Sequence, residues 1–404
     1  MVDDVTRPLP TVLATGAWLK NQACLLASER VLWSGPHGDL STPEACQALT
    51  QSVDALFLPD RPLAAVAHDL HPDFFSTTLA QRCASQHGVP AIAVQHHHAH
   101  VAAVVAEHRL EQPVIGLALD GVGLGTDGTP WGGELLWVHH EKWQRLGHFQ
   151  PLPLPGGDRA ATEPWRMGCA VLHALGQAEY MSTLFAHAVG SARVDAVRQL
   201  LARDVRCPRG SSAGRWFDAA SALLGLVLVQ HDEAQAPMAL ERAAAAWLAD
   251  HGNTDAACDA LVDPNMTRLM LREDGLLDPL PLLSTLLSAK PPARRDAGDV
   301  GRRAALFHLT LARALVDWAT RAARMCDVGT VCLGGGCFFN RILSAEVEHG
   351  LRAQGLDVRR PVTHSCGDAG LALGQAWVAA HQTRLATAPN DSKETSCASP
   401  FPLK

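Results

Sequence analysis

The sequence lacks the marks of a secreted, membrane-spanning or zinc-ribbon protein. Its N-terminus carries no basic flank followed by an apolar segment, and no uninterrupted apolar run approaches the length that a bilayer requires. Eleven cysteines are scattered along the chain without a CxxC pair, which argues against a zinc ribbon, a thioredoxin-like site and a disulfide scaffold. We therefore expect reduced thiols and a cytoplasmic protein that contacts no membrane.

Positive charge is also scarce. The formal net charge is −7 and the lysines and arginines are dispersed, so the sequence shows no electrostatic footprint for wrapping nucleic acid. With 404 residues, of which 47% are hydrophobic, the chain is long enough for two lobes that each bury a core. We expect a globular protein whose macromolecular partner is another protein.

A strand, a glycine-centred turn and a second strand occur twice, about a hundred residues apart. The first unit is Thr11–Leu26, with a third strand at Arg30–Trp33, and the second begins at Val114–Asp120 and returns through Gly132–Val138. A helix is expected from Thr42, and helical patterns dominate from about 165 to 320. From Thr383 onward the Ser, Thr, Asn and Pro content rises and periodicity disappears, so we expect residues 383–404 to form a disordered tail.

Histidine is concentrated at one place. Four histidines fall within five positions in Gln95–His100, directly after an apolar run. A lone HxxxH pair arises by chance about once in such a chain, whereas this cluster arises roughly once in a hundred such chains. If the run opens a helix, His96 and His100 lie one turn apart on the same face, and both imidazoles reach one divalent ion. The cluster therefore predicts a metal site.

A glycine-rich stretch, Asp120–Gly128, follows the second apolar strand. Glycines let the backbone approach a ligand closely and turn several amides toward one anion, which suits a phosphate. No helix follows, so the stretch is not a dinucleotide-binding fingerprint. A hairpin whose turn is Asp127-Gly128 explains the same residues, and both interpretations stay open.

Two further elements lie near the C-terminus. Gly334-Gly335-Gly336 ends an apolar strand and precedes an apparent helix start, which would place backbone amides at a helix N-terminus, a favourable place for phosphate. Many α/β connections of this kind bind nothing. Asp368 lies at the expected start of the last helix, where it is either a helix cap or the oxygen ligand that a two-histidine site lacks.

These four elements, in this order, resemble the Kae1-like domain of the HypF carbamoyltransferases, which mature nickel–iron hydrogenases. The similarity extends from about Thr11 to Ala380. Shorter motifs of the family occur in the same order: Leu19–Asn21, Gly38–Leu40, Ala67–Pro72, Leu152–Asp158, Glu163–Arg166 and Ser211–Asp218. One departure is Ala234, which stands where the family usually has glycine.

The resemblance implies an α/β fold of the actin-like and Hsp70-like ATPase architecture, in which two related lobes hold a nucleotide between them. We expect one Kae1-like domain over residues 8–382, with lobe I at about 8–112 plus a C-terminal helix at about 367–382, and lobe II at about 113–366. Full-length members carry acylphosphatase, zinc-finger-like and YrdC-like regions before this domain. Because the similarity begins near residue 11, we expect a truncated form that consists of the Kae1-like domain only.

The resemblance also assigns roles to single residues. It implies that His96 and His100 are paired metal ligands, with Asp368 and Asp120 completing a set that suits Fe(II) or Zn(II). Lys20 and His68 are candidates for stabilising developing charge. His97 and His98 are expected beside the site, with a structural role for His98. The adenylate is expected to contact Gly121, Gly123, Gly125, Asp218, Gly334, Gly335, Gly336 and Asn340.

The activity that the resemblance implies is transfer of a carbamoyl group. Carbamoyl phosphate and ATP give a carbamoyl adenylate, and the carbamoyl group passes to the C-terminal cysteine of the partner HypE, as the precursor of the hydrogenase cyanide ligands. One alternative is an O-carbamoyltransferase that acts on a small-molecule hydroxyl, and another is a non-catalytic carbamoyl-carrier or binding subunit. The tRNA threonylcarbamoyl transferases share the fold, but their Ser-Gly-Gly-His-like turn is absent at residues 120–125.

Overall fold

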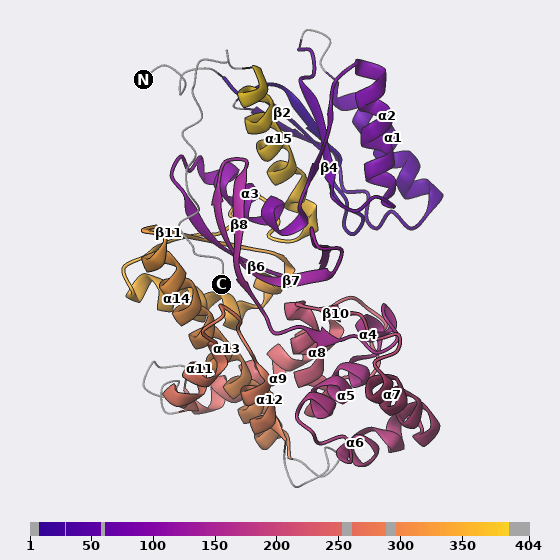
Figure 1. Ribbon diagram of the computed structural model, residues 1–404, viewed down its shortest axis with the longest axis vertical. Helices are drawn as coiled ribbons and strands as arrows, with labels where there is room; N and C mark the ends of the chain where they lie inside the picture. The colour runs from indigo at the N-terminus through magenta and orange to yellow at the C-terminus, as the bar shows by residue number, and fades with distance from the viewer. Residues whose placement is uncertain (1–7, 29, 58–60, 253–260, 288–295, 388–404) are drawn as a thin grey trace.

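The computed structural model describes residues 8–28, 30–57, 61–252, 261–287 and 296–387. These residues form two five-stranded mixed sheets and a block of helices (Figure 1). No helix in these ranges is both long and apolar enough to cross a membrane. The last helix continues to Thr387, so residues 383–387, which we predicted in the tail, are helical, whereas residues 388–404 lie outside the described ranges.

The first sheet has the strand order β3-β2-β1-β4-β5. The first three strands form an antiparallel meander, and β4 and β5 continue the sheet in parallel with β1, which confirms the predicted meander. Thr42 caps α1 as predicted, because its hydroxyl accepts from the Ala45 amide at 3.2 Å. The elements are β1 (Val12–Ala14), β2 (Cys24–Ala27), β3 (Arg30–Trp33), α1 (Pro43–Leu56), β4 (Ala65–Asp69), α2 (Phe75–His87) and β5 (Ala91–Val94).

The second sheet repeats this arrangement in the order β8-β7-β6-β11-β12. Again three antiparallel strands are followed by two parallel ones, which confirms that the strand pattern occurs twice. A helix follows the fourth strand of each sheet, α2 in the first and α14 in the second. The elements are β6 (Val114–Leu124), β7 (Pro130–His139), β8 (Lys142–His148), β11 (Thr330–Gly334), the 3₁₀ turn η2 (Gly336–Phe339), α14 (Arg341–Ala353) and β12 (Asp357–Arg359).

A helical block is inserted between β8 and β11, where the sequence predicted mostly helix, and it lies beneath the second sheet in Figure 1. It also contains a two-stranded ribbon, β9 with β10. The elements are β9 (Leu152–Pro153), α4 (Arg159–Thr162), α5 (Pro164–Ala174), α6 (Tyr180–Val189), α7 (Ser191–Arg203), β10 (Arg209–Gly210), α8 (Ala213–Leu223), α9 (Gln235–His251), α11 (Pro264–Met270), α12 (Leu280–Leu286) and α13 (Ala297–Met325).

The two helices that follow the sheets exchange partners. Helix α3 (His96–His108) follows the last strand of the first sheet, but it packs on β6, β7 and β11 of the second. Helix α15 (Leu371–Thr387) follows the second sheet through the 3₁₀ turn η3 (Asp368–Gly370), but it packs on β1, β2 and β4 of the first. The two helices also pack against each other, and together they connect the two halves (Figure 1).

Alternating side chains on the strands divide the core into layers. On β1, Val12 faces the layer of α3 and α15, whereas Leu13 faces α1 and α2. On β6, Val114 faces the same α3–α15 layer, whereas Ile115 faces the helical block. The α3–α15 layer is therefore a core that both halves share.

Gly374 sets the distance between α3 and α15. A Cβ atom on this residue would lie 1.8 Å from the carbonyl oxygen of Ala99 and 2.8 Å from the amide nitrogen of Ala103, both on α3. Real Cβ contacts are never this short, so any side chain at position 374 would push the two helices apart. The shared core therefore requires glycine here.

We predict that Gly374→Ala lowers the free energy of unfolding by about 1–3 kcal/mol, because it overpacks the shared core. The loss is expected even though alanine is the better helix former by about 1 kcal/mol. Gly329→Ala is the control, since a Cβ atom there meets nothing within 4 Å. Denaturant unfolding of both variants measures the effect, and equal stabilities for the two would contradict the assigned role of Gly374.

Candidate metal centre

Helix α3 presents two of the predicted ligands. It begins at His96, and the side chain of Gln95 caps it by accepting a hydrogen bond from the His98 amide at 2.8 Å. His96 and His100 are therefore one turn apart at the start of the helix, and their Nε2 atoms lie 3.2 Å from each other. Both side chains are buried, as the predicted pairing requires.

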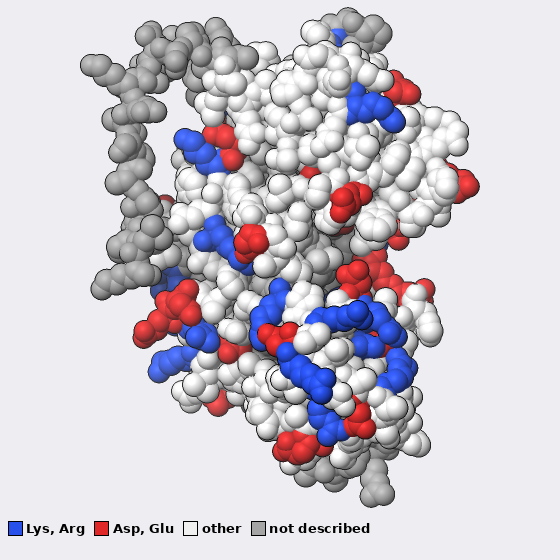
Figure 2. Space-filling view, turned by 45° about the vertical axis from the view of Figure 1, so that its right-hand side comes forward, with Lys and Arg blue, Asp and Glu red and all other residues white. Residues whose placement is uncertain are grey.

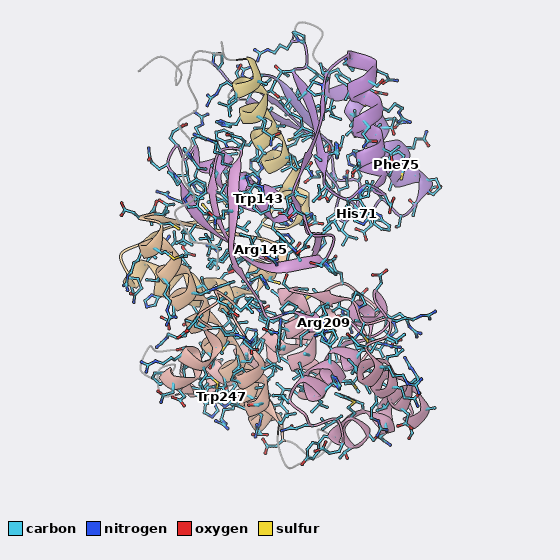
Figure 3. The ribbon with its side chains drawn as sticks, in the orientation of Figure 1. His71, Phe75, Trp143, Arg145, Arg209 and Trp247 are labelled. Atoms are coloured by element: carbon cyan, nitrogen blue, oxygen red, sulfur yellow. The ribbon has the colours of Figure 1, made fainter. Side chains whose placement is uncertain are left out.

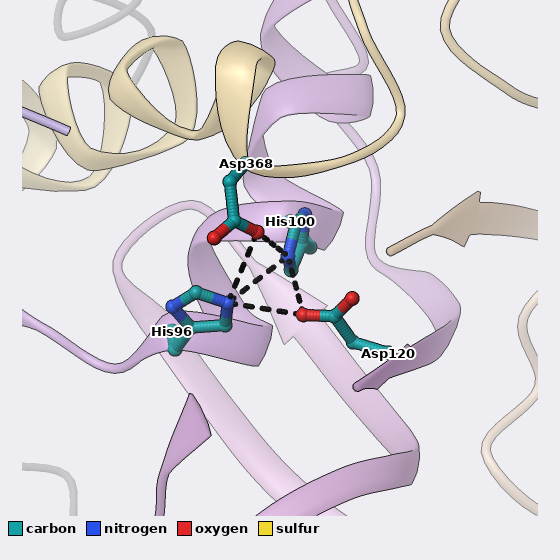
Figure 4. A group of neighbouring side chains, drawn as sticks. All are labelled: His96, His100, Asp120 and Asp368. Atoms are coloured by element: carbon teal, nitrogen blue, oxygen red, sulfur yellow. Dashed lines mark hydrogen bonds and ion pairs between the residues drawn. The ribbon is translucent and has the colours of Figure 1, made fainter. Parts of the chain in front are cut away.

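Two carboxylates from distant parts of the chain complete the group (Figure 4). Asp120 lies on β6 where the register with β7 shifts between Leu119 and Gly123, and such an irregularity turns a side chain out of the regular alternation. Asp368 begins η3, directly before α15. Its carboxylate faces the two imidazoles, as a ligand would.

The spacing of the four ligand atoms fits a tetrahedral ion. The two Nε2 atoms lie 3.2 and 3.4 Å from Asp120 Oδ2 and both lie 3.6 Å from Asp368 Oδ1. All four atoms lie within 4.8 Å of one another. Donor atoms that surround a metal at about 2.1 Å are about 3.4 Å apart. Two imidazoles and two carboxylates form a donor set for Zn(II) or Fe(II).

Electrostatic interactions shift the pKa of each of the four groups. Burial lowers the pKa of His96 and His100, but the facing carboxylates outweigh it, so both pKa values lie above the usual one, and that of His96 well above. Burial raises the pKa of Asp120 and Asp368, but the hydrogen bonds from the imidazoles outweigh it and lower both. A divalent cation between the four groups would take the place of the protons through which the imidazoles contact the carboxylates.

Asp69 contacts the imidazole of His96 on the side opposite to the other candidate ligands. Its Oδ2 lies 2.7 Å from His96 Nδ1, and both side chains are buried. A carboxylate in this place fixes the ring so that Nε2 is the atom turned toward a metal. Asp69 is not among the site residues predicted from the sequence. Its position at the carboxyl end of a parallel strand, where α/β sheets usually bind ligands, is the signal that could have identified it.

His68 precedes Asp69 on β4 and, because strand side chains alternate, lies on the opposite face of the sheet. Its Nδ1 donates to the carbonyl oxygen of Asp69 at 2.7 Å. The structure therefore does not bring His68 to the four ligands, and its role in stabilising charge stays a prediction.

The remaining histidines of the cluster lie beside the four ligands. His97 Nδ1 lies 3.1 Å from Gln95 Nε2, and its other nitrogen has no partner among the described residues. His98 Nε2 donates to the His140 carbonyl at 3.3 Å, and its ring lies against Trp143, which is labelled in Figure 3. Burial lowers the pKa of His98 to about 4, so the ring is neutral and structural at neutral pH.

The glycine-rich stretch is part of a hairpin. β6 continues to Leu124 and pairs with β7, and Gly128 has a positive φ of 77°, so the hairpin interpretation with a turn at Asp127-Gly128 is confirmed. A Cβ atom on Gly123 would lie 2.7 Å from the ring of His96, and one on Gly125 would lie 2.1 Å from Trp131. These glycines leave room for neighbouring rings.

The second glycine turn differs from the prediction. η2 separates it from α14, which begins at Arg341, so the glycines are not at the N-terminus of that helix. Instead, the Gly336 amide donates to Asp120 Oδ1 at 3.0 Å and thereby orients a ligand. Gly335 has φ +99°, and a Cβ atom on it would lie 2.3 Å from the Leu119 carbonyl oxygen. Gly334 similarly approaches the carbonyl oxygen of His100, at 2.9 Å from its Cβ position.

A pocket of about 320 Å³ opens beside the ligands. Asp120 and Asp368 line the pocket together with Gly121 and Gly336. Of the predicted nucleotide contacts, Gly121 and Gly336 are the two that line it. Asn340 instead caps α14, and its Nδ2 lies 2.9 Å from His308 Nε2. Gly123, Gly125, Gly334 and Gly335 do not line this pocket.

Two cations line the pocket. Lys20, from the β1–β2 connection, pairs with Glu233 at 2.9 Å, so the ion pair joins residues of the two halves. Burial lowers the pKa of Lys20, but Glu233 and the site carboxylates outweigh it and raise it. Arg215 lines the wall with its Nη2 2.9 Å from Asp218, which lies behind it and whose pKa is raised to about 6 by burial.

Ala234, next to Glu233, has φ +58°. This is the left-handed region, in which glycine is less strained than alanine. This left-handed conformation explains why the HypF-type sequences that the chain resembles usually have glycine at this position.

We predict that His96→Ala, His100→Ala and Asp368→Ala abolish stoichiometric metal binding, because each removes one of four ligands. Asp69→Asn should lower metal affinity about 10- to 100-fold, since the ring of His96 loses the carboxylate that orients it. His98→Gln is the control within the same helix and should retain the metal. Metal analysis of the purified variants is the measurement, and full metal content in either histidine variant would refute the ligand assignment.

Family profiles match most of the chain. The family profile described as "HypF Kae1-like domain" matches residues 7–107, and that described as "Carbamoyltransferase, Kae1-like Domain, second subdomain" matches residues 116–375. A protein of Cupriavidus necator named "Carbamoyltransferase HypF homolog" is 55% identical over 94% of this chain and 93% of its own length.

Longer relatives match over part of their length. The chain is 45% identical to "Carbamoyltransferase HypF2" of Cupriavidus necator and spans 48% of it. A solved structure, full-length HypF in the phosphate- and nucleotide-bound form, is 28% identical with a TM-score of 0.78 over 93% of this chain and 56% of that one. The chain therefore belongs to the HypF carbamoyltransferase family, in which it corresponds to the Kae1-like domain.

Proposed function

We propose that this protein transfers a carbamoyl group, derived from carbamoyl phosphate by way of carbamoyl adenylate, to the C-terminal cysteine thiol of HypE during hydrogenase maturation. The observation that carries the proposal is the four-residue metal centre that opens into a pocket with two cationic side chains. A metal site beside a site for an anion is what an acyl adenylate needs, because its carbonyl and its phosphate are adjacent.

The residues of the pocket would bind the carbamoyl adenylate and stabilise the departing AMP. His96, His100, Asp120 and Asp368 would hold the metal, which when bound supplies a Lewis acid for the carbamoyl carbonyl. Lys20 and Arg215 face the same space and stabilise the phosphate charge. The acceptor thiolate forms a bond to the carbamoyl carbon, the bond from that carbon to the phosphate oxygen breaks, and AMP leaves with the electron pair.

Lys20 is suited to a ligand that binds reversibly. Its side chain and that of Glu233 are about half exposed, at 50% and 56%, and such surface ion pairs contribute little to stability. A phosphate can therefore take the place of Glu233 on the ammonium group at small cost.

We also infer a cytoplasmic location, because the described cysteines are all free thiols.

Carbamoyl transfer is the direct test. We expect incubation with carbamoyl phosphate, ATP and purified HypE to add one carbamoyl group to the HypE C-terminal peptide, as measured by mass spectrometry. His100→Ala should abolish the addition and His98→Gln should retain it. If no carbamoylated peptide forms, even after addition of a YrdC-type protein, the proposal is wrong. Carbamoylation of a small-molecule hydroxyl instead would identify an O-carbamoyltransferase.

ATP binding tests the two cations separately. We predict that Lys20→Met and Arg215→Met each weaken ATP binding about tenfold, because each removes one charge-assisted contact to the phosphates. Arg272→Met is the charge-matched control, since Arg272 pairs with Asp274 at the surface and does not line the pocket. Calorimetric titration measures the affinities. If Lys20→Met, Arg215→Met and Arg272→Met have equal dissociation constants for ATP, the phosphates do not bind in this pocket.

A further inference from the structure

A second pocket, larger than the one at the metal centre, lies in the helical block. It has a volume of about 550 Å³, and four of the side chains that line it are arginines: Arg159, Arg166, Arg193 and Arg206. Figure 2 shows basic side chains gathered over this part of the molecule. The chain as a whole carries a net charge of −7, so this concentration of positive charge is a local feature.

One carboxylate holds three of these arginines. Glu163 Oε1 accepts from Arg159 Nη2 at 3.0 Å and from Arg193 Nη2 at 2.8 Å, and its Oε2 accepts from Arg166 Nε. Burial raises the pKa of Glu163, but the hydrogen bonds and charges of these arginines outweigh it and lower it, so the carboxylate stays ionised. Three positive charges around one negative charge leave the group with an excess of two.

Arg206 adds a further uncompensated charge. Within the described part of the chain its guanidinium has no hydrogen-bond or ion-pair partner, although it lines the same pocket. Asp195 on α7 is paired with Arg198, and Asp204 after α7 is paired with Arg209. The pocket therefore has an excess of three positive charges.

Arg166 and Arg193 are held in place before any ligand arrives. The side chain of Arg166 is only 8% exposed, and its Nη1 donates to the Pro155 carbonyl at 3.2 Å. Arg166 and Arg193 also lie over the ring of the buried Trp165, at 5.1 and 5.5 Å from its centre. Such prior ordering reduces the entropy that binding an anion would otherwise cost.

Arg206 is positioned by its backbone. It has φ +52°, and its carbonyl oxygen accepts from the Gly156 amide at 2.8 Å, which ties its loop to the loop before α4. A left-handed conformation is strained for a side chain of this size, and the surrounding contacts maintain it. The loop that carries Arg206 therefore forms a fixed edge of the pocket.

We propose that this arginine pocket binds the phosphate group of a small anionic ligand. Planar guanidinium groups match phosphate oxygens in pairs, and an excess of three charges suits a dianion better than a single carboxylate. The buried position of Arg166 requires a ligand that enters the pocket, which a compact phosphate does and an extended acidic peptide does not. The proposal does not depend on the carbamoyl transfer proposed above.

The pocket adjoins the metal centre through α4. Arg159, at the start of this short helix, lines the arginine pocket, whereas Ala161 and Thr162 line the pocket with Asp120 and Asp368. A phosphate bound to Arg159 would thus contact the opposite side of the same helical turn. This arrangement places the second ligand next to the reaction site but outside it.

Equilibrium dialysis of the whole protein against labelled inorganic phosphate tests the proposal, with excess AMP present to occupy the pocket at the metal centre. We expect the double variant Arg193→Met/Arg206→Met to weaken phosphate binding at least about tenfold. Arg206→Lys should fall between the double variant and the wild type, because it keeps the charge and loses the paired donors. Arg198→Met is the control, since Arg198 shares α7 but pairs with Asp195 outside the pocket.

The competing ligands identify the source of the phosphate group. Displacement by carbamoyl phosphate at lower concentration than by inorganic phosphate assigns a phosphorylated metabolite, and the reverse order assigns free phosphate. Displacement by a hexaglutamate peptide at lower concentration than either overturns the proposal in favour of an acidic protein segment. Equal phosphate affinity in the wild type and the double variant, with unchanged thermal unfolding, also overturns it, as does an equal loss in Arg198→Met.

Discussion

Helices α3 and α15 meet backbone to backbone at Ala99 and Gly374, and the geometry of the candidate metal centre depends on this contact. His96 and His100 lie at the start of one helix, and Asp368 lies directly before the other. A metal site tolerates errors of about 0.2 Å in its ligand distances, which is far less than the displacement that a single added methyl group would cause. The absence of a side chain at position 374 is therefore a condition for a site several residues away.

Electrostatics imposes the second condition. Two carboxylates buried together would repel each other, and the imidazoles beside them remove that repulsion only while they are protonated. A divalent cation removes it without protons, and the remaining oxygen of Asp120 is satisfied by the amide of Gly336. The carboxylates are thus compensated either by hydrogen bonds from the imidazoles or by a cation. Asp69 keeps the ring of His96 in one orientation in both cases.

Local sequence patterns were sufficient for the pairing of His96 with His100 and for the repeated strands, whereas the candidate ligands Asp120 and Asp368 came from the family resemblance. The spacing of His96 and His100 depends on one helical turn, and the repeated meander depends on short-range alternation. The role of Gly336 could not be predicted in this way, because it joins Asp120 across 216 positions. Asp69 was missed because only the tertiary structure shows which strand face meets α3. The exchange of α3 and α15 between the sheets leaves no local pattern at all.

The exchange of helices also sets an order of events during synthesis on the ribosome. The strands of the first sheet are complete by Val94, but one apolar face of this sheet is covered by α15, which is made only after residue 370. Until then, Val12, Ala14 and their neighbours on that face have no native partner from α15. The nascent chain therefore exposes an apolar sheet face through most of its elongation, which is the kind of surface that chaperones bind and that aggregates form on.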